Sequence, residues 1–177
     1  MRIDIRFAAP DMAHVDALRC EVLVLTCFAD ERPLRSIAGL VDWRMCGFLS
    51  KRMFDGFITG HAGEQVLIPT QGRIPVDKIL LFGLGEQPRF ATADGEQQIR
   101  RIFDTLADLG LRTAGIVLPG RSTDCLDAKT AMETLVLGSQ VAQPPDELVL
   151  FENHDAERDM APIVDRERRR ERARHYP

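Results

Sequence analysis

The strongest constraint on the fold is an alternation of short apolar runs, rich in β-branched residues, with longer stretches of helical periodicity. Residues 20–28 read CEVLVLTCF, which is typical of a strand covered on both faces by other elements. Residues 78–82 and 113–118 have the same character, and apolar residues at three- and four-residue spacing follow each run. Helices between apolar strands imply crossover connections. We therefore expect an α/β fold, a three-layer αβα sandwich with a mixed, mostly parallel sheet.

Three further segments are expected to add strands to this sheet. Residues 3–7 alternate apolar and polar side chains, which predicts a half-buried strand at the edge of the sheet or next to it. Residues 65–69 and 78–82 are joined by a turn-rich segment, so we expect them to be neighbours. Residues 148–151 form a last strand in this interpretation.

Helical periodicity predicts three helices between the strands. Residues 34–49 carry one apolar stripe and are expected to form a single helix of about five turns. Thr92 is the expected N-cap of the second helix, and Thr123 or Asp124 that of the third. The stripe of the first helix consists of Leu34, Ile37, Val41, Met45, Phe48 and Leu49.

The length of the chain, 177 residues, suits one domain with a single core. We expect that domain to cover residues 1–152, because charge dominates from residue 153 onward. Residues 153–177 are then a charged tail, flexible or helical. The tail could bind nucleic acid or an acidic partner, but the acidic body and the interspersed glutamates favour a solvated tail.

The distribution of charge and hydrophobicity excludes several classes of function. The formal net charge is −4, but residues 166–174 hold six arginines and two glutamates, so the rest of the chain carries about −8. An acidic body argues against a groove for nucleic acid. No apolar stretch reaches the roughly 20 residues of a membrane span, and the first residues lack the apolar region of a signal peptide. We expect no membrane association and a cytoplasmic location.

Two glycine-containing loops follow predicted strands, where ligand crevices open in α/β sheets. Gly83, Leu84, Gly85 and Glu86 close one strand and could cradle a phosphate, or could form a tight turn that needs a positive φ. The sequence lacks the third glycine of a dinucleotide fingerprint and the lysine of a phosphate loop. The second loop offers backbone amides and a guanidinium to an anion, although helix capping explains it equally well; it contains Gly120, Arg121 and Ser122.

Other residue types give no pattern of catalysis or metal binding. The four cysteines are too scattered for a zinc site or a disulfide framework, and no histidine pair has the spacing of a helical metal site. We therefore predict no catalytic residue, no metal and no cofactor. Trp43, Met45 and Phe48 lie close together on the first predicted helix, where they are expected to pack in the core or at an interface.

Three stretches resemble the N-terminal domain of the leucyl aminopeptidase family, the cytosolic two-metal exopeptidases. Residues 54–64, FDGFITGHAGE, are similar to that family's F-x-G-K-x-G-E segment. Residues 77–85, DKILLFGLG, are similar to its R-V-L-L-V-G-L-G strand and turn. Residues 131–139, AMETLVLGS, are similar to its E-G-L-x-L-G-x-Y helix. The three occur in the family's order and spacing, and the resemblance covers roughly residues 21–151.

The resemblance implies a macro-domain-like αβα sandwich whose relatives keep their chemistry in a separate C-terminal domain, which has no counterpart here. The best-known metal-binding stretch of that domain reads N-T-D-A-E-G-R, and residues 153–158, NHDAER, are superficially similar. We reject that match, because the glycine is lost, the arginine is shifted and too few residues follow to build a fold around two cations. Aminopeptidase activity is predicted to be absent, and the protein is not expected to be an enzyme.

Two hypotheses about function remain open. As a module for assembly, partner binding or regulation, the domain would form a homo-oligomer or associate with a full-length aminopeptidase. As a macro-like binding module, it would hold ADP-ribose or a related nucleotide between the two glycine loops. An enzyme of another type is a third class, which only generic residues support. The first hypothesis predicts an exposed apolar patch near Trp43, and the second predicts backbone amides that converge on an anion site.

Overall fold

The computed structural model describes residues 3–175 and has a six-stranded sheet at its centre. The strand order is β1-β6-β5-β2-β4-β3, and every neighbouring pair is parallel except β3 and β4. This confirms the mixed, mostly parallel sheet, with residues 3–7 contributing an edge strand. The strands are β1 (Asp4–Ala8), β2 (Val22–Cys27), β3 (Gln65–Pro69), β4 (Lys78–Gly83), β5 (Thr113–Ile116) and β6 (Glu147–Phe151).

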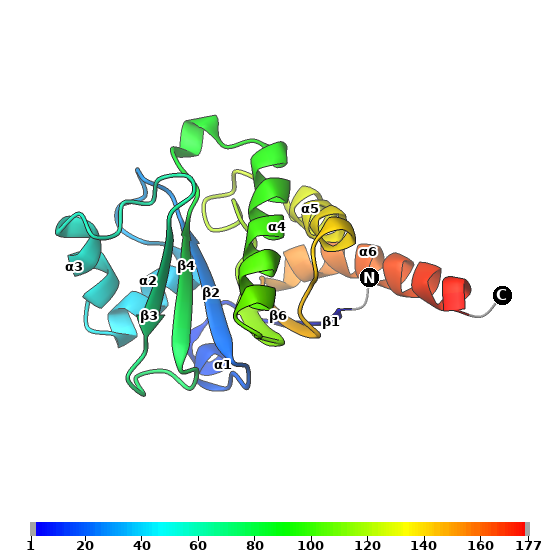
Figure 1. Ribbon diagram of the computed structural model, residues 1–177, viewed down its shortest axis with the longest axis horizontal. Helices are drawn as coiled ribbons and strands as arrows, with labels where there is room; N and C mark the ends of the chain where they lie inside the picture. The colour runs from blue at the N-terminus through cyan, green and yellow to red at the C-terminus, as the bar shows by residue number, and fades with distance from the viewer. Residues whose placement is uncertain (1–2, 176–177) are drawn as a thin grey trace.

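Helices cover both faces of the sheet, so the molecule has the expected three layers. Figure 1 shows α4, α5 and α6 on one side of the sheet and α2 and α3 on the other. A short helical turn spans Gln87–Arg89. The helices are α1 (Met12–Asp16), α2 (Ser36–Arg44), α3 (Phe48–Phe54), α4 (Thr92–Asp108), α5 (Ala128–Val141) and α6 (His154–His175).

The central position of β2 explains its almost uninterrupted apolar sequence. All six of its residues are buried. Successive side chains of a strand point to opposite faces, so Leu23 and Leu25 pack in the layer of α1–α3. Val22 and Val24 pack in the layer of α4–α6. Burial on both faces confirms the prediction for this segment.

The single helix predicted over residues 34–49 is wrong: the structure has two helices there, α2 and α3. The chain leaves the helical conformation at Cys46 and Gly47, whose φ angles are 58° and 75°. The apolar stripe still faces the core, since Leu34, Val41 and Leu49 are buried. Periodicity therefore predicted which side chains are inside. It did not reveal the break, because buried apolar side chains recur on both sides of the left-handed turn.

Two predicted helix caps also need correction. Thr92 is the first residue of α4, and the Asp94 carboxylate accepts a hydrogen bond from the backbone N–H of Ala91 before it. Asp127 caps α5 by accepting a hydrogen bond from the backbone N–H of Thr130. Neither Thr123 nor Asp124 does so, because the chain makes several turns between β5 and α5 before it enters the helix.

The charged C-terminal segment is helical from His154 to His175. Its first half lies in the same hydrophobic layer as α4 and α5. Farther along, Arg168 forms an ion pair with Asp4 of the edge strand, and the end of the helix projects from the body (Figure 1). The division into domain and tail at residue 152 stays a prediction. The side chains that pack against the body are Ala156, Met160, Ile163 and Val164.

Candidate functional site

The two glycine loops lie at the same edge of the sheet, at the carboxyl ends of β4 and β5. The strand between them is β2, which ends next to Phe28. The ring of Phe90 lies between the loops. It packs edge-on against Phe28, with ring centroids 5.2 Å apart. It also lies so close to Gly120 that a Cβ there would be 2.8 Å from a ring carbon. An aromatic side chain thus occupies the space between the two loops.

The backbone amides of the first loop already have acceptors within the protein. Gly83 donates to the carbonyl of Glu64 at 3.0 Å, and Leu84 donates to that of Cys27 at 2.9 Å. Gly85 donates to the carbonyl of Gly60 at 2.9 Å and has a φ of 83°, the conformation that the tight-turn interpretation requires. These three donors hold neighbouring loops together, so they do not converge on an anion.

The carboxylate of Glu86 is engaged in an ion pair at the surface. It is exposed and pairs with Arg89, three residues farther along, at 3.1 Å. An exposed pair of this kind contributes little to stability. Of the four residues predicted in this loop, Gly83, Leu84 and Gly85 therefore use their backbone N–H groups within the protein, and Glu86 uses its carboxylate in an ion pair.

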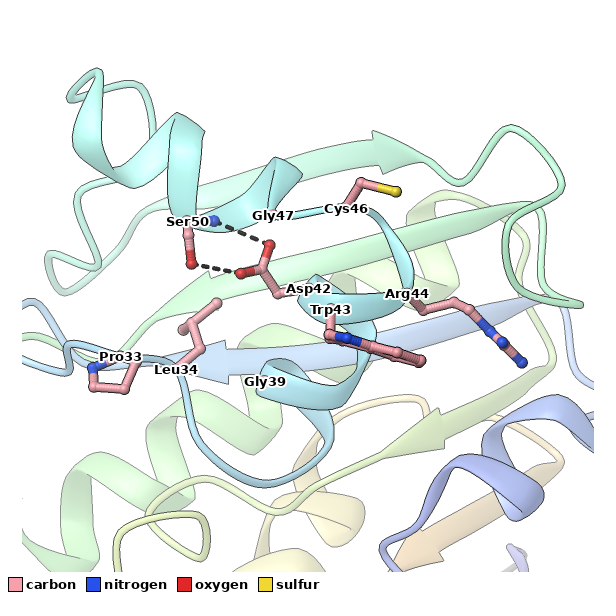
Figure 2. Close-up of a pocket in the computed structure, with 9 residues that line it drawn as sticks. All are labelled: Pro33, Leu34, Gly39, Asp42, Trp43, Arg44, Cys46, Gly47 and Ser50. Atoms are coloured by element: carbon pink, nitrogen blue, oxygen red, sulfur yellow. Dashed lines mark hydrogen bonds between the residues drawn. The ribbon is translucent and has the colours of Figure 1, made fainter.

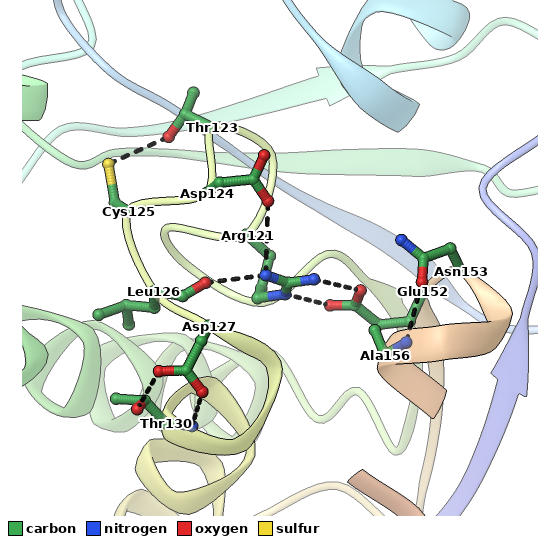
Figure 3. A network of polar contacts seen from close by, with 10 residues as sticks. All are labelled: Arg121, Thr123, Asp124, Cys125, Leu126, Asp127, Thr130, Glu152, Asn153 and Ala156. Atoms are coloured by element: carbon green, nitrogen blue, oxygen red, sulfur yellow. Dashed lines mark hydrogen bonds and ion pairs between the residues drawn. The ribbon is translucent and has the colours of Figure 1, made fainter. Parts of the chain in front are cut away.

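Arg121 of the second loop is held in a buried ion pair (Figure 3). Its guanidinium donates two hydrogen bonds to Glu152, at 2.9 and 3.1 Å, and a third to the carbonyl of Leu126 at 2.8 Å. The two side chains are only 10% and 5% exposed. The hydrogen bond with Glu152 raises the pKa of Arg121. Its charge is thus compensated inside the protein. Beside it, the hydroxyl of Ser122 is buried with no partner among the described residues.

The predicted interface residues divide into exposed and buried members. The Trp43 side chain is 70% exposed and that of Phe48 is 39% exposed, but Met45 is 5% exposed and belongs to the core. Two further aromatic residues, Phe54 and Phe57, are 92% and 65% exposed at the end of α3 and just after it. Sequence reasoning missed both. The available signal was that they fall outside the apolar stripe that continues from Leu49 to Met53.

A hollow of ≈ 680 Å³ lies where α2 meets α3. Trp43 is on its wall, and Pro33 and Leu34 line it from the segment before α2 (Figure 2). The carboxylate of Asp42 is directed at α3, where it accepts hydrogen bonds from the backbone N–H groups of Leu49 and Ser50 at 2.7 and 3.1 Å. The carboxylate of Asp42 in this hollow thus joins the two helices.

Replacement of Asp42 by alanine is expected to lower the free energy of unfolding by about 1–2 kcal/mol, because α3 loses its N-terminal cap. Urea unfolding followed by circular dichroism measures this loss. Asp55→Ala is the matched control, since Asp55 lies at the other end of α3 and its nearest ion-pair contact, with Arg52, is at 3.8 Å. Equal losses in the two variants would contradict the capping role.

The described residues contain no group of three histidine, cysteine or acidic side chains that could hold a metal ion. The four cysteines are free, and burial raises the pKa of Cys27 to about 12. Asn153 caps α6 by accepting a hydrogen bond from the N–H of Ala156. Residues 153–158, which superficially resemble a metal-binding motif, thus form the start of a helix. No described helix is long and apolar enough to cross a membrane.

Comparison with known families identifies the domain. Residues 24–142 match the N-terminal domain of the cytosol aminopeptidase family. The chain belongs to this family. The match includes all three stretches from which the resemblance was inferred, and it confirms that inference. Only the N-terminal domain of the family is matched.

Curated relatives of this cytosol aminopeptidase N-terminal domain are much longer proteins. A probable cytosol aminopeptidase of Nitrosomonas eutropha is 28% identical over 99 residues, which are 53% of this chain and 20% of that protein. Another, from Glaesserella parasuis, is 26% identical over 96 residues, 54% of this chain and 19% of that protein. The chain therefore spans about a fifth of the length of the curated relatives that it matches.

Solved structures share the fold at low sequence identity. A mutant of tomato leucine aminopeptidase superimposes with a TM-score of 0.60 and 17% identity, covering 90% of this chain and 35% of that one. A Trypanosoma brucei macrodomain in complex with ADP gives 0.70 and 14%, covering 91% and 69%. The macrodomain of Mycobacterium tuberculosis DarG gives 0.62 and 17%, covering 85% and 99%. These matches confirm a macro-like α/β fold.

Proposed function

We propose that this cytosol aminopeptidase N-terminal domain is a non-catalytic module for assembly, partner binding or regulation. The observation that carries the proposal is an exposed set of aromatic side chains on one side of the sheet. We call it the α2–α3 aromatic surface. Large aromatic side chains are enriched at protein interfaces, where they supply much of the binding energy. The surface consists of Trp43, Phe48, Phe54 and Phe57.

The partner that fits this proposal is a second copy of the chain or a full-length aminopeptidase of the cytoplasm. The curated relatives are whole aminopeptidases, so a domain of this kind is found joined to a catalytic domain in those proteins. Only the N-terminal domain of the family is matched in this chain, which supports a role without peptide hydrolysis by this domain itself. Binding of a partner through the α2–α3 aromatic surface requires no catalytic group in the domain.

Replacement of Trp43 by alanine is expected to weaken self-association, or association with a co-expressed full-length aminopeptidase, by at least about tenfold. Sedimentation velocity over a concentration series, with and without the aminopeptidase, measures the effect. Trp43 is 70% exposed, so the variant should keep its fold. Leu137→Ala on α5 is the control, because Leu137 is also exposed but lies in the opposite helical layer. The proposal would be contradicted if the unchanged protein were a monomer at all concentrations and bound no aminopeptidase.

Titration with ADP-ribose distinguishes the module from a macro-like nucleotide binder. We expect no saturable heat in calorimetry, because Phe90 occupies the space between the two glycine loops and the amides of Gly83, Leu84 and Gly85 have internal acceptors. Saturable binding that Gly85→Val abolishes would instead support the nucleotide hypothesis. Gly72→Val serves as the control for Gly85→Val, since Gly72 also has a positive φ but lies in the turn between β3 and β4.

A further inference from the structure

The two edges of the sheet differ in how their backbone is covered. At the β1 edge, the guanidinium of Arg168 on α6 donates a hydrogen bond to the carbonyl of Ile5 at 3.2 Å and pairs with Asp4 at 3.0 Å. At the opposite edge, β3 is the last strand, and within residues 3–175 it pairs with β4 alone. An uncovered edge offers backbone N–H and C=O groups to a further strand. The β3 edge is therefore the open side of this sheet.

The register of β3 against β4 determines which of its backbone groups face outward. The carbonyl of Glu64 accepts a hydrogen bond from the N–H of Gly83, and at the other end of the ladder Thr70 donates to the carbonyl of Asp77. Residues whose backbone groups face the partner alternate with residues whose groups face away in an antiparallel pair, so residues 64, 66, 68 and 70 face β4. The residues whose backbone groups point away from β4 are therefore Gln65, Leu67 and Pro69.

The side chains of β3 do not protect this edge from another strand. Natural edge strands often carry charged side chains for that purpose, but Gln65–Pro69 reads QVLIP and has none. Leu67 is 56% exposed, while Leu80, directly opposite on β4, is buried. Pro69 removes one N–H from the edge, where proline is tolerated in sheets, and keeps its carbonyl. The outer side of β3 is thus uncharged and has no neighbouring strand among the described residues.

We propose that β3 pairs antiparallel with β3 of a second copy of the chain, around a two-fold axis at Leu67. This inference deepens the assembly role proposed above and rests on it. The N–H of each Leu67 donates to the carbonyl of Leu67 in the other copy, and the N–H of Gln65 donates to the carbonyl of Pro69 in the other copy. Every outward N–H of the strand then has an acceptor. The missing N–H of Pro69 leaves only the carbonyl of Gln65 without a donor.

A second copy is the partner that fits this edge. Two-fold pairing uses the same surface of both copies, which is the commonest symmetry of homo-oligomers, and main-chain hydrogen bonds provide affinity when a strand is added to a sheet edge. Like charges directly opposite each other destabilise strand pairs. The uncharged strand avoids that repulsion, although each copy has a net charge of −4.

The pairing also brings the α2–α3 aromatic surfaces of the two copies together on one face. Figure 1 shows α3 at the β3 end of the sheet, and Leu49 and Met53 of α3 belong to the same hydrophobic cluster as Ile68 of β3. The two-fold axis of an antiparallel pair is perpendicular to the sheet, so elements on one face of each copy share a face of the joined sheet. Both α3 helices then flank the paired strands.

Disulfide cross-linking through introduced cysteines tests this register. Leu67→Cys, in a background where the exposed Cys46 is replaced by serine, is expected to give a covalent dimer under mild oxidation. The two Cα atoms would be about 5.5 Å apart, within the range of a disulfide. Gln65→Cys is the matched control, because the two Gln65 positions lie four residues apart along the paired strands, about 13 Å. Equal cross-linking of the two variants, or cross-linking of neither, overturns the proposal.

Two substitutions at Leu67 test the same contact through the strength of association. Leu67→Pro removes only an outward N–H, and Leu67→Lys places like charges opposite each other. Each is expected to weaken dimerisation at least about tenfold in sedimentation velocity over a concentration series. Leu67 is 56% exposed, so Leu67→Lys should keep the fold, which circular dichroism checks. Leu137→Lys is the control, because it adds the same charge at an exposed position of α5.

The outcomes separate strand pairing from the broader assembly role. A dimer of the unchanged protein that Leu67→Lys leaves intact overturns pairing through β3 but not assembly. A chain that is monomeric at all concentrations and binds a full-length aminopeptidase also overturns only the pairing through β3. A chain that is monomeric and binds no aminopeptidase contradicts both. A dimer that Leu67→Cys cross-links and Leu67→Lys weakens supports both.

Discussion

Arg121→Ala is expected to destabilise the domain by about 3–5 kcal/mol, because it leaves the buried carboxylate of Glu152 without a compensating charge. The ion pair joins the loop between β5 and α5 to the end of β6, directly before α6. The third hydrogen bond, to the carbonyl of Leu126, holds the same loop. Equilibrium unfolding in urea, with the slope compared between variants, measures the loss.

Two further variants separate the buried charge from other effects of the Arg121 substitution. The double variant Arg121→Met, Glu152→Leu removes both charges and is expected to recover most of the stability. Arg89→Ala breaks an exposed pair with Glu86 and is expected to cost less than about 1 kcal/mol. A loss for Arg121→Ala as small as that for Arg89→Ala would show that the buried pair is not the main contribution.

Gly83→Ala is expected to destabilise the domain by about 3 kcal/mol or more, through a collision that the backbone must relieve. A Cβ on Gly83 would lie 2.1 Å from the carbonyl oxygen of His61 and 2.7 Å from the carbonyl carbon of Gly60. Both contacts are with backbone atoms, which cannot rotate away as a flexible side chain does. The shift would also strain the hydrogen bond from Gly83 to Glu64.

The matched control for Gly83→Ala is Gly72→Ala. Gly72 has a φ of 74° and open space around its Cβ position, so alanine meets only the cost of the left-handed conformation, about 1 kcal/mol. Thermal unfolding of the two variants under the same conditions gives the comparison. If Gly83→Ala loses no more stability than Gly72→Ala, the close approach of the two loops at β4 is not a tight constraint.

The positions of the two glycine loops were predicted, but their contacts were not. The rule that loops at the carboxyl ends of parallel strands meet at one edge placed Gly85 and Gly120 together, and the structure has them there. The partners of these loops come from elsewhere in the chain: Glu152 is 31 residues from Arg121, and Phe90 packs against both Phe28 and Gly120. Nothing in the local sequence of either loop identifies those partners.

The exposed aromatic side chains of α2 and α3 were likewise predicted only in part. The stripe of the first predicted helix correctly placed Val41 and Leu49 inside. It also included Phe48, which is 39% exposed and is the first residue of α3, directly after the turn at Cys46 and Gly47. The capping bonds from α3 to Asp42 accompany that turn, and they become visible only when both helices are placed.

The sequence by itself determined the layered α/β architecture, the central strand at residues 22–27 and membership of the aminopeptidase N-terminal family. Strand and helix periodicities are local features of the sequence. They indicate directly whether an element is buried on one face or on two. The tertiary structure alone decided that Phe90 packs against Phe28 and Gly120, that Arg121 is neutralised by Glu152 and that the amide of Gln98 lacks a partner among the described residues. Hydrogen bonds and close packing depend on which distant segments meet, and that is fixed only when the layers come together.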